Sequence, residues 1–214
     1  MKETSTAHAA GQQTAPGIGI LTKHISRERL LALDKHEPII VAEAPSGYGK
    51  TALAHSWLLA SPKSAHRAWV SLSEGAGDPS VFLDLLTTSL MGKQPHPSEA
   101  GLGNEANHVE AFARLADRLI DGPQALCLVL DDAHHLAGSP SRLYLQRLLL
   151  GASEHFRIFI TTQPAALDVG LGQLTAQGKT CWINADTLAL DRSEVESLAQ
   201  LRGHALQTKQ LDSL

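Results

Sequence analysis

Ala44-Pro-Ser-Gly-Tyr-Gly-Lys-Thr51 is the stretch of this sequence that decides the fold. It follows a short apolar run, residues 38–42, and it precedes a stretch of helical character, residues 52–59. A strand, a glycine-rich loop and a helix in this order are the context in which the motif G-x-x-x-x-G-K-[ST] binds phosphate. This copy begins with Ala44 in place of the first glycine. The flanks favour a nucleotide-binding Walker A loop over a glycine-rich turn that carries a lysine by chance.

Each residue type in this loop suits one part of a phosphate site. Gly47 and Gly49 can adopt backbone angles that turn successive amides toward phosphate oxygens. Lys50 is expected to reach the β- and γ-phosphates, and the Thr51 hydroxyl is expected to bind Mg²⁺. The first amides of the following helix add donors at the positive end of its dipole. The residues expected to bind the nucleotide here are Ser46, Gly47, Tyr48, Gly49, Lys50, Thr51 and Ala52.

A second motif ends the apolar run at residues 127–130, where two acids follow. A strand buried on both faces ends where a parallel sheet opens, so its last residues reach the ligand crevice. Asp131 is expected to hold Mg²⁺ through water, and Asp132 to orient or deprotonate the attacking water. An acidic turn after an apolar strand is the alternative, and the upstream phosphate loop favours the functional interpretation. His134 and His135 do not extend this into a transition-metal site, because adjacent histidines on a turn rarely point to one centre.

A third apolar run, residues 157–161, ends in polar residues. In P-loop proteins with an extra strand between the phosphate-loop strand and the acidic strand, that extra strand places a polar residue near the γ-phosphate. Thr162 is the candidate for this catalytic position, and Thr161 is the alternative. Two β-branched residues that simply finish a strand would look the same.

Composition limits the class of protein. The 214 residues carry a net charge of −4 with both signs mixed, and they show no basic stripe for gripping nucleic acid. The two cysteines, Cys127 and Cys181, lie in apolar runs and predict buried reduced thiols rather than a disulfide or a metal pair. No apolar run approaches a membrane span, and residues 1–10 lack the apolar core of a signal peptide. We therefore expect a cytoplasmic protein with no membrane contact.

Strands and helices alternate along the chain. Besides the strand before the phosphate loop, strands are expected at residues 68–72, 125–130, 157–161 and 180–183. Helices are expected at residues 25–32, 52–59, 78–90, 105–121, 141–150 and 192–202, with Ser26 and Asp78 as caps and a loop at residues 92–104. This order predicts the α/β three-layer sandwich of P-loop NTPases, a mostly parallel five-stranded sheet with helices on both faces.

The predicted domain organisation has three parts. Residues 1–17 are expected to be a disordered tail, because they are rich in Ala, Gly, Gln and Thr without periodicity. Residues 18–190 form the P-loop ATP-binding domain. Residues 191–214 are expected to begin a following helical segment or to be a truncated linker.

The three motifs, in this order, resemble the ATP-binding domain of the MalT-like regulators. Those are large LuxR-type transcription activators within the STAND class of signal-transduction ATPases. Tyr48 between the two glycines and His134 after the acidic pair match the family. Further similar stretches are residues 26–31, 69–72, 78–82 and 194–198. The resemblance spans about residues 25–202.

The resemblance implies a nucleotide switch. ATP or ADP would bind with Mg²⁺, hydrolysis would be slow, and the ATP state would favour self-association. The adenine would lie near residues 25–29, which makes Arg27 a further candidate for nucleotide binding. Family members are several times longer and bind DNA through a helix-turn-helix domain absent from this chain. We therefore expect either a fragment or a short protein that retains the nucleotide module.

Departures from the family pattern bear on hydrolysis. The family places an arginine just after the polar residue of the third strand, and here the residue is Gln163. The following segment carries Gln173, Thr175 and Gln177 where the family tends to carry arginines. Arginine binds phosphate bidentately and offsets transition-state charge, so we expect retained binding with weaker γ-phosphate sensing or hydrolysis. Asp132 is one methylene shorter than the glutamate of many fast ATPases, which also indicates weaker hydrolysis.

Two alternatives remain open. A working ATPase of the AAA type would need an arginine from a neighbouring subunit, for which Arg142, Arg147 and Arg157 are the candidates. A non-catalytic interaction module would keep the fold and hold nucleotide permanently, and the missing arginines support it. The absence of an Asn/Thr-Lys-x-Asp guanine-reading motif favours ATP over GTP.

Overall fold

The computed structural model describes residues 25–91, 105–164 and 167–203. The tail expected at residues 1–17 and the loop expected at residues 92–104 lie outside the described residues, as does the chain after residue 203. No helix in the described part is both long and apolar enough to cross a membrane.

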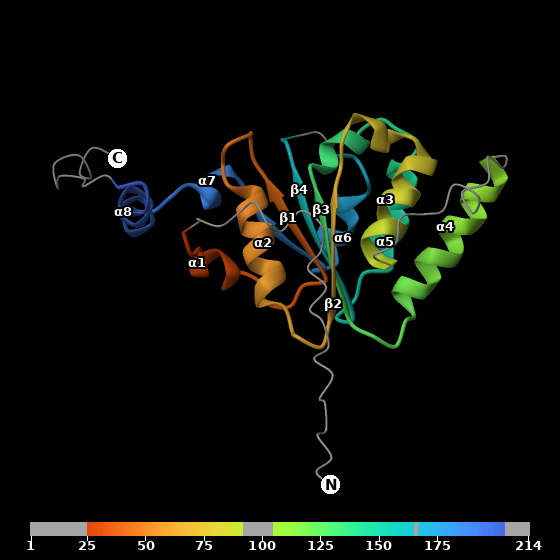
Figure 1. Cartoon of the computed structure of the whole chain (residues 1–214), viewed down its shortest axis with the longest axis horizontal. Coiled ribbons are helices and arrows are strands. Elements are labelled where there is room, and N and C mark those ends of the chain that lie inside the picture. Colours follow the sequence, from red (N-terminus) through yellow and green to blue (C-terminus); the bar gives the residue numbers. More distant parts are fainter. Residues whose placement is uncertain (1–24, 92–104, 165–166, 204–214) are drawn as a thin grey trace, which may run out of the picture.

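Five parallel strands form one sheet in the order β2-β3-β4-β1-β5 (Figure 1). Their bounds are β1 Ile39–Glu43, β2 His66–Ser71, β3 Leu126–Asp131, β4 Phe156–Thr162 and β5 Thr180–Ile183. β4 pairs with β1 on one side and with β3 on the other. The predicted parallel sheet, with an extra strand between the phosphate-loop strand and the acidic strand, is therefore confirmed.

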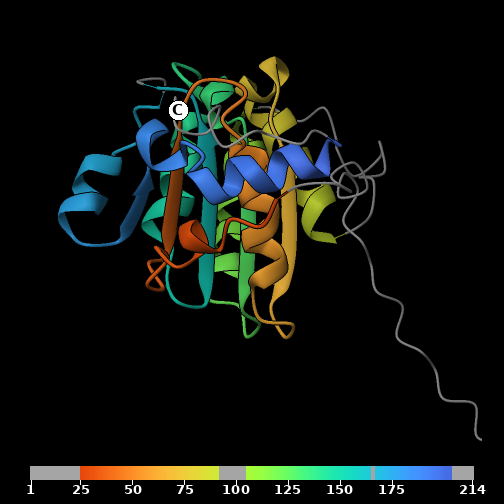
Figure 2. The same cartoon turned by 90° about the vertical axis from the view of Figure 1, so that its left-hand side faces the viewer.

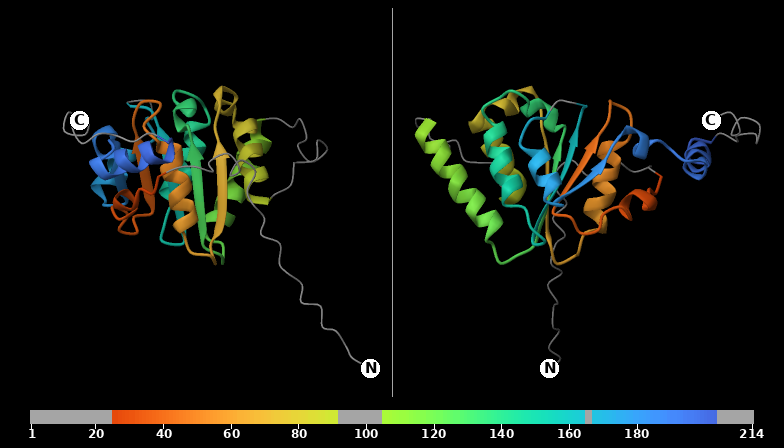
Figure 3. Two further views of the ribbon diagram at one scale, coloured as in Figure 1. Left: turned by 60° about the vertical axis from the view of Figure 1, so that its left-hand side comes forward. Right: turned by 180° about the vertical axis from the view of Figure 1, so that it is seen from behind.

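Helices cover both faces of this sheet, which confirms the three-layer sandwich. Their bounds are α1 Glu28–Leu31, α2 Lys50–Ala60, α3 Pro79–Met91, α4 Glu105–Ile120, α5 Arg142–Leu150, α6 Leu171–Ala176, α7 Ala185–Leu188 and α8 Arg192–Leu201, with 3₁₀ turns η2 Glu74–Gly77 and η3 Ala133–Leu136. Figure 1 and the right-hand view in Figure 3 show α1 and α2 on one face and α3, α4 and α5 on the other. α8 lies outside these layers and crosses in front of α2 in Figure 2.

Strand alternation divides the core into two halves. Along β3, Leu128 and Leu130 pack with the α3–α5 side, whereas Cys127 and Val129 pack with the α2 side. Successive strand residues point to opposite faces, so each strand contributes to both halves. Cys127 is buried and free, and the partly buried Cys181 is free as well.

The helix caps follow the expectations in one case and depart from them in another. Asp78 Oδ1 accepts hydrogen bonds from the amides of Ser80 (2.8 Å) and Val81 (3.4 Å), so the predicted cap of α3 is confirmed. Ser26 as a cap was wrong. Its hydroxyl donates to Glu28 Oε1 (3.3 Å), and Arg27 is the N-cap residue of α1. The helix therefore begins later than predicted.

Candidate nucleotide-binding site

The phosphate loop between β1 and α2 has the backbone that a phosphate cradle needs. Gly47 and Gly49 have φ angles of 89° and 80°, in the left-handed region that favours glycine. The loop residues 45–48 are exposed. Gly49 is the N-cap of α2 and provides no side-chain hydrogen bond to its first turn. The first amides of α2 are thus open to an anion.

Lys50 lies at the centre of this loop. It is the first residue of α2 and is buried. Its Nζ donates to the carbonyl oxygens of Ala44 and Pro45, each at 2.8 Å. Desolvation lowers the pKa of Lys50, while the charges of Asp132 and Asp131 act in the opposite direction. The ammonium therefore ties the end of the loop to its beginning and faces the acidic pair.

The two sequence motifs meet at Asp131. Its Oδ1 accepts hydrogen bonds from the hydroxyls of Thr161 (2.6 Å) and Thr51 (3.1 Å). Strand alternation explains this meeting, because Asp131 and Thr161 continue the side of the sheet on which Val129 and Phe159 pack with α2. Thr51, in the first turn of α2, lies over that same side.

The surroundings of Asp131 fit a hard divalent cation. The side chain is only 6 % exposed, and burial raises its pKa against the lowering effect of the hydrogen bond from Thr161. Its carboxylate and the Thr51 hydroxyl place two oxygen ligands side by side, which is the donor set that Mg²⁺ prefers. The residues present therefore fit the predicted Mg²⁺ ligands, Thr51 and Asp131.

Asp132 occupies a different environment. Its φ of 61° is left-handed, an uncommon conformation for a residue other than glycine, and such strain often accompanies functional sites. Its amide donates to Thr161 Oγ1 at 2.8 Å, whereas its side chain is 49 % exposed. The carboxylate is therefore accessible to water, as its predicted role requires.

The structure distinguishes between the two threonines at the end of β4. Thr161 bridges the acidic pair, as described above. Thr162 follows Ile158 and Ile160 on the opposite face, and its hydroxyl makes a long bond of 3.4 Å to the carbonyl of Gln163. The contacts thus favour Thr161 beside the acids, and a catalytic role for Thr162 stays a prediction.

A contact between Gln163 and His134 was not foreseen. Gln163 Nε2 lies 3.1 Å from His134 Nε2, and His134 Nδ1 lies 3.8 Å from Asp132 Oδ1. Burial lowers the pKa of His134. This pair joins the end of β4 to the turn after β3.

Within the described residues, no group of three or more His, Cys, Asp or Glu side chains gathers in a way that could hold a metal ion.

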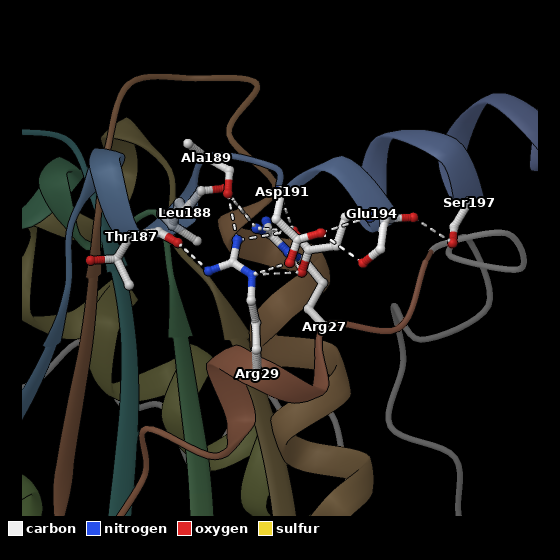
Figure 4. Close-up of polar contacts among 9 residues, drawn as sticks. Arg27, Arg29, Thr187, Leu188, Ala189, Asp191, Glu194 and Ser197 are labelled. Atoms are coloured by element: carbon white, nitrogen blue, oxygen red, sulfur yellow. Dashed lines mark hydrogen bonds and ion pairs between the residues drawn. The ribbon is translucent and has the colours of Figure 1, made fainter. Parts of the chain in front are cut away.

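Arg27 lies beside the phosphate loop but is held by the C-terminal segment. A Cβ placed on Gly49 would be 3.8 Å from its Nη1. Its Nη2 donates to the carbonyl of Leu188 (2.7 Å) and to Glu194 Oε2 (3.2 Å), as Figure 4 shows. Sequence reasoning missed Glu194 as a partner, and the predicted contact of Arg27 with nucleotide stays a prediction.

Two of the arginines suggested for a neighbouring subunit are paired within the chain. Arg157 forms an ion pair with Asp34, and Arg147 pairs with Asp117 at 2.8 Å. Arg157 also lines a cavity of about 590 Å³, together with Trp57 and the first residues of β3. This cavity lies at the amino ends of the strands, so it is not part of the candidate site at their carboxyl ends.

A family model described as an AAA domain matches residues 33–169. The serine/threonine-protein kinase PknK of Mycobacterium tuberculosis is 25% identical over 223 residues, which cover 92% of this chain and 20% of that protein. The HTH-type transcriptional regulator MalT of Klebsiella pneumoniae is 27% identical over 186 residues, which cover 83% of this chain and 20% of that regulator. The chain spans about a fifth of the length of these relatives.

Solved structures share the fold. Cdc6p from Pyrobaculum aerophilum superimposes with a TM-score of 0.59 at 16% identity, over 90% of this chain and 52% of that one. The ORC2 protein of Aeropyrum pernix, in ADPNP-ADP complexes, gives a TM-score of 0.50 at 16% identity, over 82% of this chain and 48% of that one. At these identities the similarity concerns the fold alone.

Proposed function

We propose that this chain, which belongs to the AAA-domain family, is an ATP-binding switch domain of a MalT-like, LuxR-type regulator of the STAND class. It is a P-loop domain related to the MalT regulators. In this proposal it works in the cytoplasm, hydrolyses ATP slowly and self-associates when ATP is bound. DNA binding would belong to another domain of such a regulator. Residues 18–190 would form the switch domain, and residues 191–214 would begin the next segment.

One observation carries the proposal. Thr51 and Asp131 are 80 residues apart in sequence, yet their side-chain oxygens lie 3.1 Å from each other. Thr51 closes the phosphate loop, and Asp131 ends the acidic strand. A site for a nucleotide with Mg²⁺ needs both elements at one point, which is the carboxyl edge of the sheet.

The residues would divide the work as follows. A nucleotide phosphate would compete with the carbonyls of Ala44 and Pro45 for the Lys50 ammonium. Bound Mg²⁺ would neutralise charge between the phosphates. Asp132, which is open to water, would orient or deprotonate the attacking water. The remaining proposed nucleotide contacts are Arg27, Ser46, Gly47, Tyr48, Gly49, Thr51 and Ala52, and Thr162 is kept as a proposed catalytic residue beside Thr161.

Slow turnover is proposed because Gln163 provides a neutral amide at the end of β4. Its contact with His134 (3.1 Å) occupies this amide with a protein partner. A guanidinium at this position would offset developing negative charge far better. For the alternative of a working ATPase of the AAA type, two of the three candidate arginines, Arg147 and Arg157, are already in ion pairs within the chain, and Arg142 stays the remaining candidate.

Calorimetric titration with ATP, ADP and GTP, with and without Mg²⁺, tests the proposal. The native chain should bind adenine nucleotides, and Lys50→Ala should lose this binding, whereas Lys63→Ala, at an exposed loop position, should retain it. Sedimentation velocity should then detect larger species with Mg·ATP than with Mg·ADP. A folded native chain that binds no nucleotide would refute the proposal, and self-association that is independent of nucleotide would favour the interaction module.

A further inference from the structure

α8 is attached to the rest of the chain through charge rather than through an apolar surface. Across its residues, all of them described, Glu194 is the buried one and is 6 % exposed. Val195 and Leu198 are only partly buried, and Leu201 is 40 % exposed. Figure 2 shows α8 crossing outside α1 and α2. The position of the helix therefore depends on what holds Glu194.

Two arginines from the start of the domain hold this carboxylate. Glu194 accepts hydrogen bonds from Arg27 Nε (3.3 Å) and Nη2 (3.2 Å), and from Arg29 Nε (3.0 Å) and Nη2 (2.9 Å). Arg29 also pairs with Asp191 at 3.2 Å, and Figure 4 shows the four side chains together. We call Arg27, Arg29, Asp191 and Glu194 the arginine latch.

The latch also holds the backbone that leads to α8. Arg29 Nη1 donates to the carbonyl of Thr187 (2.9 Å), and both arginines donate to the carbonyl of Ala189. Burial alone would raise the pKa of Glu194, but hydrogen bonds from Arg29, from the Asp191 amide and from Arg27 outweigh it and lower that pKa. The arginine latch therefore holds the segment from Thr187 to Glu194 by ion pairs and hydrogen bonds.

Arg27 connects the arginine latch to the phosphate loop. Its Nε and Nη2 are directed at Glu194 and Leu188, while its Nη1 lies 3.8 Å from the Cβ position of Gly49. A phosphate held by the loop amides would therefore come close to a guanidinium that already binds a carboxylate. Guanidinium binds phosphate bidentately, and a phosphate bound through Nη1 and Nη2 would compete for Nη2 with Glu194 and the carbonyl of Leu188, to which Nη2 already donates.

We propose that Arg27 couples nucleotide occupancy to the position of α8, because a nucleotide phosphate and Glu194 compete for one guanidinium. This inference rests on the proposed nucleotide site and describes its regulation. When nucleotide binds, the hold of Arg27 on Glu194 weakens, and the segment from Thr187 onward loosens. Linkage is reciprocal, so loosening the latch must strengthen nucleotide binding by the same factor.

Amide hydrogen exchange and calorimetry test this coupling. Saturating Mg·ADP should speed exchange across residues 187–201 of the native chain. Glu194→Gln should give fast exchange without nucleotide and should bind ADP about fivefold more tightly, at the lower end of typical coupling. Arg27→Gln should also exchange fast but should bind ADP more weakly. Glu196→Gln, on the same helix and paired with Arg192, is the matched control and should behave like the native chain.

The test depends on the opposite changes in ADP affinity that are expected for Glu194→Gln and Arg27→Gln. If the latch were only structural, both variants would loosen α8 and leave the ADP affinity unchanged, which would overturn the coupling but not the proposed function. Unchanged exchange in a native chain that binds ADP would overturn it as well. If the folded native chain binds no ADP, the proposed function fails and the coupling fails with it. Circular dichroism melting would verify that each variant folds.

Discussion

Replacing Asp131 by asparagine distinguishes the effect of its charge on the stability of the fold from the effect of that charge on ligand binding. Asparagine has nearly the same shape, and its amide oxygen can accept the hydrogen bonds from Thr51 and Thr161. The substitution therefore removes a buried charge and little else. We expect Asp131→Asn to be more stable than the native chain at pH 7 and to lose Mg²⁺-dependent nucleotide binding.

The expected gain in the free energy of unfolding is about 1 to 2 kcal/mol. Burying an ionised carboxylate costs several kcal/mol, here on the order of 3 to 4 kcal/mol because the Lys50 charge lies nearby. Each of the two hydroxyl hydrogen bonds weakens by about 1 kcal/mol when its acceptor becomes neutral. The removed cost of burying the charge exceeds the weakening of the two hydrogen bonds, so the variant should have the larger free energy of unfolding.

The difference in stability between Asp131→Asn and the native chain should increase with pH. Burial raises the pKa of Asp131 from 3.8, so the folded state holds its proton more tightly than the unfolded chain does. The native stability from this group is present below pH 3.8 and falls as the pH rises to the raised pKa. Asparagine does not titrate, so its advantage should be small near pH 4 and complete at neutral pH.

Urea unfolding at several pH values, followed by circular dichroism, measures this difference. Asp84→Asn, an exposed substitution on α3, is the control and should change stability little at any pH. In calorimetry, Mg·ATP should bind Asp131→Asn at least about tenfold more weakly, which is a loss of about 1.4 kcal/mol. A variant that is less stable than the native chain at pH 7, or whose advantage shrinks as the pH rises, would show that the buried Asp131 charge does not destabilise the fold.

Three further predictions concern the loop, the strand end and a thiol. Thr161→Val should lower the free energy of unfolding by about 2 kcal/mol, because it leaves the Asp132 amide without its partner and removes one of the two hydroxyl hydrogen bonds to Asp131. Thr162→Val should change it by less than about 1 kcal/mol; equal losses in urea titrations would contradict this. Gly49→Ala should cost about 1 to 2 kcal/mol, because φ is 80° there; an unchanged melting temperature would show that the loop relaxes. Cys181 should react slowly with a disulfide reagent at pH 8, since burial raises its pKa to about 11, and a rate equal to that of a free thiol would rule out this environment.

The sequence predicts those parts of the fold that local patterns specify. The phosphate loop carries its own strand, glycines and helix, and β3 is a continuous apolar run that ends in acid. The missed elements are short. α6 spans six residues and contains Gly172, and α7 spans four. Such segments lack the two turns over which a helical period can be recognised, and they form because neighbouring elements hold them.

Other features depend on contacts that no local pattern encodes. Thr161 and Thr162 are the same residue type at the same strand end, and only the alternation of β4 against its neighbours determines which one faces α2. Arg27 and Glu194 are 167 residues apart in sequence. Their pairing follows from the position of α8, which the sequence of either segment alone does not specify.

The strand order has a consequence for how the chain acquires its structure during synthesis. β4 separates β1 from β3, so the sheet has no middle until residues 156–162 have left the ribosome. Before that point, β1 lacks its parallel partners, and β2 and β3 form at most a ribbon with an open edge. Unpaired edges of this kind attract other chains, and pairing distant segments is slow. The nascent chain should therefore expose open strand edges until β4 inserts between β1 and β3.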